Sequence, residues 1–348
     1  METALEMDAR AAAPSRPRLY AGSRQHGDPT VRRSGGCCQG YNPKRPGRKS
    51  HHPLLAVLAE APCILHAWLR SGNTGASRGV CAFLAEALGL LPENFKLRCV
   101  RADSGFFDQA FFTFLEARQL PYIIVAKLTT QIKRKLCGLT EWTRVDDHFE
   151  VGAFNAKLQG WDRERRFVVL RERVCEDREA VGRKLIDVPG YTYRLWVTNR
   201  NEDAATLWRD YNGRATVEQR IEELKNDLHA NGFCMQSFYA TESAFLAVLF
   251  SFNLLSMYQA KVMSGKGYRQ PATLRAAVFV CGAVLGKKGR DIAMRFSESW
   301  GGIAKHKELI ERALQSENAI TPLLGGPNPK PGGWKGCEDN LSQGGCTI

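Results

Sequence analysis

The chain has 348 residues, of which 44% are hydrophobic, and its 49 Lys and Arg oppose 36 Asp and Glu for a formal net charge of +13. The length and hydrophobic content suit a folded protein with a sizeable core and exclude overall disorder. The positive charge indicates a polyanionic partner such as DNA or RNA without identifying it. The 11 cysteines form no CxxC pair and no Cys/His spacing suited to zinc, which indicates reduced thiols in the cytosol.

The first segment, residues 1–40, is rich in Ala, Arg, Gly, Pro and Ser and has no sustained period, so the sequence predicts no packed structure there. No apolar segment follows its arginines, so no secretory signal is predicted. Two short apolar runs, residues 54–60 and 64–70, come next and predict a hairpin. Apolar residues at helical spacing then predict a helix over residues 77–91.

A strand over residues 95–100, a helix over 108–118 and a strand over 122–128 follow in that order. Strand, helix and strand in succession are typical of an α/β sheet. Between residues 141 and 198 the pattern changes to β-type stretches without long helices, which predicts a β-rich insertion. The stretches cover residues 149–154, 166–173 and 191–198.

The last third is predicted to be helical, with helices from residue 202, over 216–228 and over 241–261. The apolar run at residues 244–255 is too short to span a bilayer and predicts a buried helix. The tail from residue 325 contains GGPNPKPGG, which cannot continue a helix.

Four polar residues form the most informative pattern of the chain. If residues 211–225 are helical throughout, these residues project within one narrow sector, beside an apolar stripe that includes Val217 and Ile221. The carboxylate can hold a divalent metal, and the cations can neutralise phosphate. Glu and Lys at helical spacing also form ordinary solvated helix faces, so the spacing alone does not decide. The four are Tyr211, Arg214, Glu218 and Lys225.

Asp103 adds a second signal, because it closes an apolar strand and precedes Ser104 and Gly105. Sheets present functional side chains at the carboxyl ends of their strands. Asp before Ser-Gly is also common in turns. Asp103 and Glu218 together indicate a site more strongly than either does alone.

The spacing Tyr211-x2-Arg214-x3-Glu218-x6-Lys225 resembles the YREK signature of bacterial insertion-sequence transposases of the DDE superfamily. The segment 101–106 resembles the sequence around their second aspartate, and the likeness runs from about residue 40 to 324. The resemblance implies an α/β fold with an RNase H-like mixed sheet, flanking helices and a β-rich insertion between the second and third acids.

The resemblance also implies a metal-dependent DNA transposase. Two Mg²⁺ ions, or Mn²⁺ as a substitute, would be held by Asp, Asp and Glu and would cleave and transfer a phosphodiester strand. Asp103 and Glu218 would be catalytic metal ligands, while Tyr211, Arg214 and Lys225 would bind the DNA. The expected partner is double-stranded DNA at transposon ends, with a homodimer left open, no membrane, no small-molecule substrate and a nucleoid-associated location in the bacterial cytoplasm.

The first aspartate of such a site is missing from its expected place before Gly40-Tyr41-Asn42-Pro43. Asp28 lies in that region, but Pro29 follows it directly and no apolar run supports a strand. If residues 21–39 are back-translated and read one nucleotide later, the permitted codons include Leu-Asp-Leu-Asp-Ser-Thr, the hydrophobic-Asp-x-Asp-Ser/Thr pattern of the lost strand. The sequence therefore predicts a frameshift and impaired catalysis, and an upstream DNA-binding region of relatives is predicted to be missing too.

Three interpretations follow for the chain as it stands: an impaired transposase, a DNA-binding or transposase-inhibiting remnant without chemistry, or a nonfunctional product. In the domain scheme, residues 41–135 and 201–324 form the two parts of the catalytic domain, with the second part helical. Residues 1–40 are a disordered or frame-shifted remnant, 136–200 the insertion and 325–348 a flexible tail.

Two other features have competing interpretations. Trp142 could stack on an extruded base, but a buried structural role is the preferred prediction. The basic run at residues 44–50 could contact phosphates or form a solvated turn. Neither belongs to the predicted catalytic set.

Overall fold

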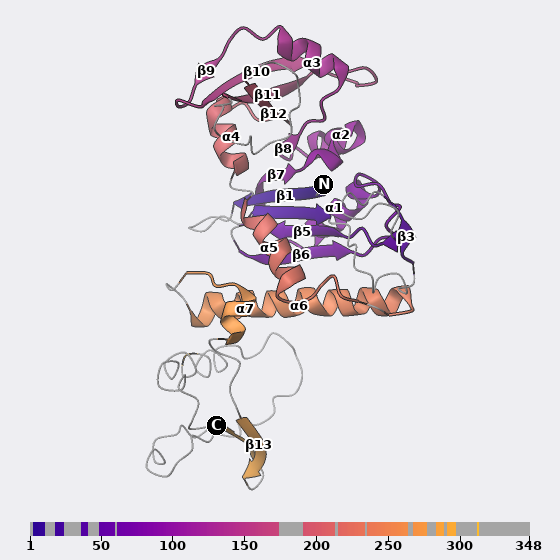
Figure 1. The fold of residues 1–348 in the computed structure, drawn as a ribbon, viewed down its shortest axis with the longest axis vertical. Coiled ribbons are helices and arrows are strands. Elements are labelled where there is room, and N and C mark those ends of the chain that lie inside the picture. Colours follow the sequence, from indigo (N-terminus) through magenta and orange to yellow (C-terminus); the bar gives the residue numbers. More distant parts are fainter. Residues whose placement is uncertain are drawn as a thin grey trace. The chain divides into compact units, whose positions relative to one another are not determined.

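The computed structural model describes most of the chain between residues 3 and 296 (Figure 1). The chain divides into two compact units, Met1–Asn253 and Leu254–Ile348, which are described separately below. The described residues are 3–10, 18–23, 36–40, 49–59, 61–173, 191–212, 215–233, 235–263, 267–276, 283–288, 291–296 and 312.

The first unit is built on a mixed sheet of eight strands in the order β1-β2-β7-β8-β12-β11-β10-β9. The sheet is mixed around β7, which pairs parallel with β8 and β2 and antiparallel with β1. The strands named here are β1 (Thr3–Arg10), β2 (Arg18–Ser23), β7 (Lys96–Ala102) and β8 (Tyr122–Val125). A mixed sheet with helices on its faces confirms the predicted α/β class.

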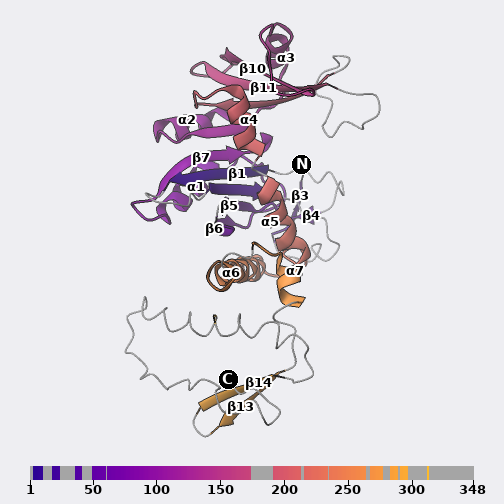
Figure 2. The ribbon, with the colours of Figure 1, turned by 90° about the vertical axis from the view of Figure 1, so that its left-hand side faces the viewer.

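The predicted hairpin is present as β5 (Leu54–Leu58) and β6 (Cys63–Trp68), which pair antiparallel. Figures 1 and 2 show it continuing the stack of strands beyond β1. Its side chains alternate between two cores, with Leu54 and Ala56 in one and Leu55 and Val57 in the other. The hairpin is therefore buried on both faces. A short additional pair, β3 (Cys38–Gln39) with β4 (Lys49–Ser50), precedes it.

The predicted insertion is confirmed as β-rich, and it extends the main sheet. Strand β12 (Tyr191–Thr198) pairs antiparallel with β8, and β11 (Arg165–Arg173), β10 (Phe149–Ala156) and β9 (Thr143–Arg144) follow outward. Helix α3 (Thr130–Cys137), which the sequence does not predict, lies between β8 and β9 and begins where the Thr129 hydroxyl accepts a hydrogen bond from the Ile132 amide.

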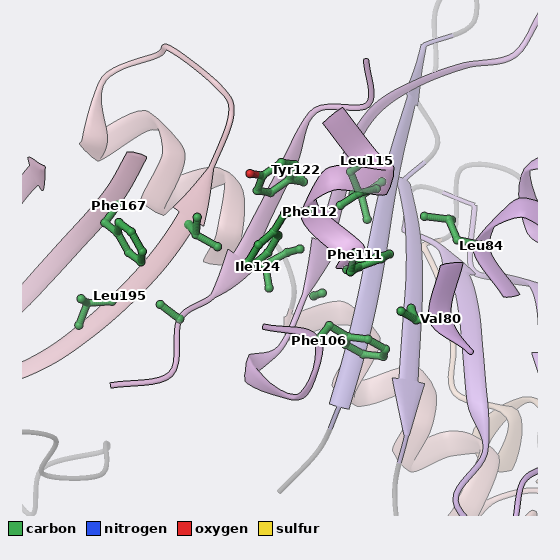
Figure 3. Packing of buried hydrophobic residues seen from close by; sticks show 14 of the residues in the cluster. Val80, Leu84, Phe106, Phe111, Phe112, Leu115, Tyr122, Ile124, Phe167 and Leu195 are labelled. Atoms are coloured by element: carbon green, nitrogen blue, oxygen red, sulfur yellow. The ribbon is translucent and has the colours of Figure 1, made fainter. Parts of the chain in front are cut away.

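Helices α1 (Val80–Gly89) and α2 (Gln109–Ala117) cover one face of the sheet and match the predicted helices. The carboxylate of Asp108 caps α2 by accepting a hydrogen bond from the Ala110 amide at 2.9 Å. Figure 3 shows the core beneath them, in which α2 and the loop after β7 contribute aromatic rings. The rings of Phe112 and Tyr122 stack at 5.5 Å between centroids. Burial of these rings is a major source of the stability of this unit.

Helices α4 (Ala204–Asn212) and α5 (Ala215–Asn226) cover the opposite face, as Figure 2 shows. Leu207 of α4 packs in a cluster with Cys99 of β7 and Trp196 of β12. Val217 and Ile221 of α5 pack in a separate cluster on the β5–β6 hairpin. The two helices thus lie on the same side of the sheet over different strands.

The amino-terminal segment differs from the sequence prediction, which expects no packed structure over residues 1–40. Strands β1 and β2 pair antiparallel with each other and belong to the main sheet. A physical reason is visible in the sequence, because residues 5–10 alternate strictly between apolar and polar side chains. That alternation favours a strand. Asp28 lies outside the described residues.

Helix α6 (Phe238–Val262) is predicted to be buried, and this prediction is wrong for one of its faces. Phe245, Leu249 and Phe252 are buried, whereas Leu246 and Phe250 are 44% and 64% exposed. The helix is apolar around its whole circumference, but only one face packs on the hairpin. It is the one described helix long and apolar enough to cross a membrane, although its most apolar window is only 22% buried, and length and composition are weak indications.

Asn253 of α6 attaches this helix to strand β6. Its amide nitrogen donates to the Ile64 carbonyl, and its amide oxygen accepts from the Ile64 N–H, both at 2.8 Å. The side chain therefore satisfies both backbone groups of one strand residue. Among the described strands, β6 pairs with β5 alone.

The second unit contains the end of α6, a short helix α7 (Pro271–Leu274) and a hairpin of β13 (Ala283–Lys288) and β14 (Asp291–Phe296). Val262, Met263 and Leu274 form its described core. The hairpin lies within residues 201–324, which the domain scheme describes as helical. The predicted flexible tail, residues 325–348, lies outside the described residues.

The turn after β6 is held from inside by buried polar groups. The guanidinium of Arg70 donates to the carbonyls of His52, Gly75 and Arg78 at distances of 3.0, 3.2 and 2.7 Å. His52 Nδ1 donates to the Thr74 carbonyl at 2.6 Å. Burial lowers the pKa of His52 from 6.5 to about 4, an effect that exceeds the opposing hydrogen bond to Thr74.

This low pKa predicts that acid destabilises the fold. Between pH 6.5 and 4 the unfolded chain binds a proton at His52 and the folded chain does not, so stability falls as the pH falls through this window. At pH 4.5 this difference in proton binding at His52 lowers the free energy of unfolding by about 2 to 3 kcal/mol relative to neutral pH. The free energy of unfolding in urea is measured at pH 7.5 and at pH 4.5. We expect the difference between the two values to be smaller for His52→Asn than for the unchanged chain. An unchanged difference would contradict the assignment to His52.

Candidate active site

Asp103 lies directly after β7, at the carboxyl end of the parallel part of the sheet. It is 4% exposed, and its backbone is extended, with φ −83° and ψ −178°. Its Oδ1 accepts a hydrogen bond from the Gly105 amide at 2.8 Å and thereby caps the turn Ser104–Phe106. Asp103 can stabilise the turn and also serve as a site residue, because the hydrogen bond to Gly105 uses only Oδ1 and holds the side chain in one orientation.

The alternation of β7 decides on which face Asp103 lies. Val100 and Ala102 belong to the core beneath α1 and α2, whereas Cys99 packs against α4 on the other face. Arg101 and Asp103 follow Cys99 at intervals of two residues and therefore share its face. Asp103 thus lies on the side of the sheet that α4 and α5 cover.

Glu218 and Lys225 both lie on α5, in its first and last turns. Glu218 is exposed and directly follows the buried Val217, while Lys225 is half-buried. The acidic Glu218 is therefore near the N-terminus of the helix and the basic Lys225 near its C-terminus, an arrangement that the helix dipole favours. Glu218 and Asp103 lie on the same side of the sheet.

Tyr211 belongs to a different helix. It lies near the end of α4, is 8% exposed, and packs its ring against Trp196 at 5.2 Å between centroids. Tyr211 is in α4 and Glu218 is in α5, and residues 213 and 214 between them lie outside the described residues, so the predicted alignment along residues 211–225 stays a prediction. Arg214 lies outside the described residues.

An ion-pair network that the sequence analysis misses anchors the end of α4. The Asp210 carboxylate lies 3.3 Å from Arg98 of β7 and 2.8 Å from Arg200 at the end of β12. Burial alone would lower the pKa of Arg200, but hydrogen bonds to Glu202 and Asp210 raise it above its ordinary value. Arg200 therefore stays charged. The network fixes the helix that precedes α5 to the strand that ends at Asp103.

Trp142 fits the structural interpretation better than base stacking. Its indole N–H donates to the Leu139 carbonyl at 3.0 Å, and the Arg171 guanidinium lies 4.0 Å from the ring centroid. The arginine covers a face on which a base would have to stack. Of the basic run, Lys49 is exposed, and residues 44–48 lie outside the described part.

The described residues do not provide a complete set of metal ligands. No group of three or more His, Cys, Asp or Glu side chains within the described ranges could hold a metal ion together. Asp103 and Glu218 are two of the three acids that the resemblance requires. Two Mg²⁺ ions close enough for catalysis normally share a further carboxylate. The residues in place therefore do not fit the two-metal site.

The comparisons with known proteins identify the family of the chain. The family model for the transposase DDE domain of group 1 matches residues 46–317, which include Asp103, the insertion and α5. No curated protein matches the chain. Because the match covers more than three quarters of the sequence, the chain belongs to the transposase family with a group 1 DDE domain.

Proposed function

We propose that this chain is a DNA transposase by descent that acts at the ends of an insertion sequence, and that its cleavage and strand-transfer chemistry is impaired. The observation that carries the proposal is the position of Asp103, at the carboxyl end of β7 and on the side of the sheet that carries Glu218. Catalytic groups of open α/β sheets gather at this edge. The proposed impairment rests on the sequence, which lacks the first acid at its expected place before Gly40-Tyr41-Asn42-Pro43.

The substrate we propose is double-stranded DNA at the element ends. The formal net charge of +13 favours a polyanion. Lys225 on α5 and Arg214 before it are the residues we assign to the phosphate backbone. Tyr211 remains part of this proposal, although it is 8% exposed and its ring packs against Trp196.

A complete site of this kind uses Mg²⁺ or Mn²⁺ to activate a nucleophile and stabilise the leaving oxygen. In this chain, Asp103 and Glu218 would hold such an ion. Asp103 is already oriented by its hydrogen bond from Gly105. Two carboxylate ligands bind a divalent ion more weakly than three. We therefore expect the chain to bind DNA even though its catalysis is impaired.

A second candidate function is that of a DNA-binding or transposase-inhibiting remnant. It is favoured by the combination of a formed sheet, in which β1 and β2 both pair with β7, with the absence of a three-acid metal group among the described residues. Such a protein would occupy element ends without cutting them. A nonfunctional product would bind no DNA and would be digested readily by a protease.

The proposal predicts the outcome of a cleavage assay on labelled duplex DNA from the flanks of the coding sequence, in Mg²⁺ or Mn²⁺. We expect no cutting by this chain and cutting by a version whose residues 21–39 are restored to the shifted reading frame. DNA binding without cutting by both chains would support the remnant. Cutting by the unchanged chain would show that another residue completes the site, and Asp28 would be the first candidate.

A further inference from the structure

Strand β8 ends at the same edge of the sheet as Asp103. It runs parallel to β7, and Ala102 of β7 pairs with Ile124 of β8. Asp103 is therefore level with Val125, the last residue of β8. Because parallel strands end at the same edge, the residues that directly follow Val125 lie beside the candidate site.

The alternation of side chains places Lys127 on the face of Asp103. Ala126 and Leu128 pack in the core beneath α1 and α2, whereas Val125 packs in the cluster with α4 on the other face. Lys127, between Ala126 and Leu128, therefore projects to the face that α4 covers, and it is exposed. It is two residues beyond the level of Asp103, which corresponds to roughly 7 Å along the strand.

Arg194 of β12 is opposite Lys127. In the antiparallel register of β8 and β12, Val125 pairs with Trp196. The register continues past this pair, because the Ala126 amide donates to a carbonyl of β12 at 2.9 Å. The next residues in the register are Lys127 and Arg194. Trp196 packs in the cluster of the α4 face, so Arg194, two residues before it, shares that face.

Two cations in directly opposite positions repel each other. Such positions have Cβ atoms about 5 Å apart, and like charges there destabilise a sheet. The Glu172 carboxylate of β11 lies 3.5 Å from the Arg194 guanidinium and balances one of the two charges. The acids nearest to Lys127 in the sequence are Glu116 and Glu141, which are 11 and 14 residues away. An anion between the two cations would remove their repulsion.

A phosphate is an anion that this pair can bind. Arginine can donate two hydrogen bonds to the oxygens of one phosphate, and lysine adds an ammonium on a flexible stem. Side chains of both types contact the phosphates of DNA. Tyr211, whose ring packs against Trp196 at 5.2 Å between centroids, lies on the same face. A DNA strand held at this edge of the sheet would pass Asp103.

We propose that Lys127 and Arg194 together bind a phosphate of the DNA backbone next to Asp103. The inference rests on the proposed function for the identity of the anion. It places a DNA contact on the strands of the sheet, in addition to the contacts that we assign to Arg214 and Lys225, and it does not depend on the missing acid.

Binding of a fluorescent DNA duplex to the full chain, measured at several chloride concentrations without divalent metal, tests the proposal. We expect Lys127→Gln and Arg194→Gln each to weaken binding about tenfold and to lower the slope of log K against log salt by about 1, as the loss of one phosphate contact requires. Lys127→Arg keeps the charge and should bind nearly as well as the unchanged chain. Absence of DNA binding by the unchanged chain would overturn the proposal.

Two exposed lysines provide matched controls, because their substitution changes the net charge equally. Lys96 is at the amino end of β7, at the opposite edge of the sheet. Lys133 is on α3, whose buried residues Ile132 and Leu136 pack in the core on the other face. Lys96→Gln and Lys133→Gln should weaken binding less than about twofold. A loss as large as that of Lys127→Gln would mean that the overall charge attracts DNA, and would overturn the proposal.

The repulsion between the two cations gives a second readout, which separates DNA binding from a structural role. Without DNA, Lys127→Glu places opposite charges across the two strands and should raise the urea concentration at the unfolding midpoint, while it weakens DNA binding more than Lys127→Gln does. A lower midpoint together with weaker binding would show that Lys127 supports the fold, and would refute the inference. If the binding results are as expected and the restored chain cuts no DNA, the proposed function fails while this inference holds.

Discussion

In the chain restored at residues 21–39, Glu218→Gln is expected to reduce DNA cleavage by about 1000-fold. The substitution keeps the size of the side chain and removes a charged oxygen ligand, and the loss of several kcal/mol of transition-state stabilisation corresponds to this factor. Glu218 is exposed on the first turn of α5, so the fold does not depend on it for packing. The measurement is single-turnover cleavage of an end-labelled duplex in Mg²⁺.

The matched control for this prediction is Glu222→Gln, one helical turn further along α5. Glu222 is also exposed, and the substitution changes the net charge equally. We expect the control to cut at nearly the rate of the restored chain. A similar loss in both variants would mean that the total charge of α5, and not a ligand at residue 218, supports the reaction.

Glu116→Gln is expected to lower the free energy of unfolding by about 3 kcal/mol, because the buried Arg165 would keep only the more exposed Asp162, 3.1 Å away, as an ionic partner. Arg165, whose side chain is 2% exposed, donates to Glu116 from Nε and Nη2 at 2.7 and 2.9 Å. The Tyr122 hydroxyl donates to the same carboxylate at 2.8 Å. The interaction joins α2, β8 and β11, so its loss affects the centre of the unit. Urea unfolding at neutral pH measures the change.

The control here is Arg144→Gln, which removes an exposed pair with Asp147. The side chains are 67% and 86% exposed, so this loss should stay below about 1 kcal/mol. The double variant Glu116→Gln/Arg165→Gln should recover part of the stability, since it leaves no buried charge alone. If Glu116→Gln were as mild as the control, the buried pair would not contribute to stability as we describe.

The elements that sequence reasoning predicts correctly are those with strong local patterns. The β5–β6 hairpin and α2 follow from apolar periodicity and an Asp at the helix start. The same local logic could have found β1, because residues 5–10 alternate strictly, but an overall composition typical of disorder hides that signal. A local pattern of this kind predicts a strand only if the short segment is judged separately from the composition of the longer region around it.

The contacts that position the site are of another kind. Arg98 and Asp210 are separated by 112 residues, and no periodicity relates them. The same holds for the exposed face of α6, since its sequence is apolar on all sides and only tertiary packing selects the buried face. The sequence indicates Asp103 and Glu218 individually, while the side of the sheet that they share follows only from the fold.

The amide of Asn253 also affects how copies of the protein meet one another. Exposed strand edges offer unpaired N–H and C=O groups on which another chain can add a strand. On β6, the groups of Ile64 are already engaged by a side chain that imitates the peptide of a neighbouring strand. A helix that crosses there also blocks the approach of a second sheet. Loss of this amide would free both backbone groups of Ile64 at the edge of β6 for pairing with another copy of the chain, and would thereby favour self-association.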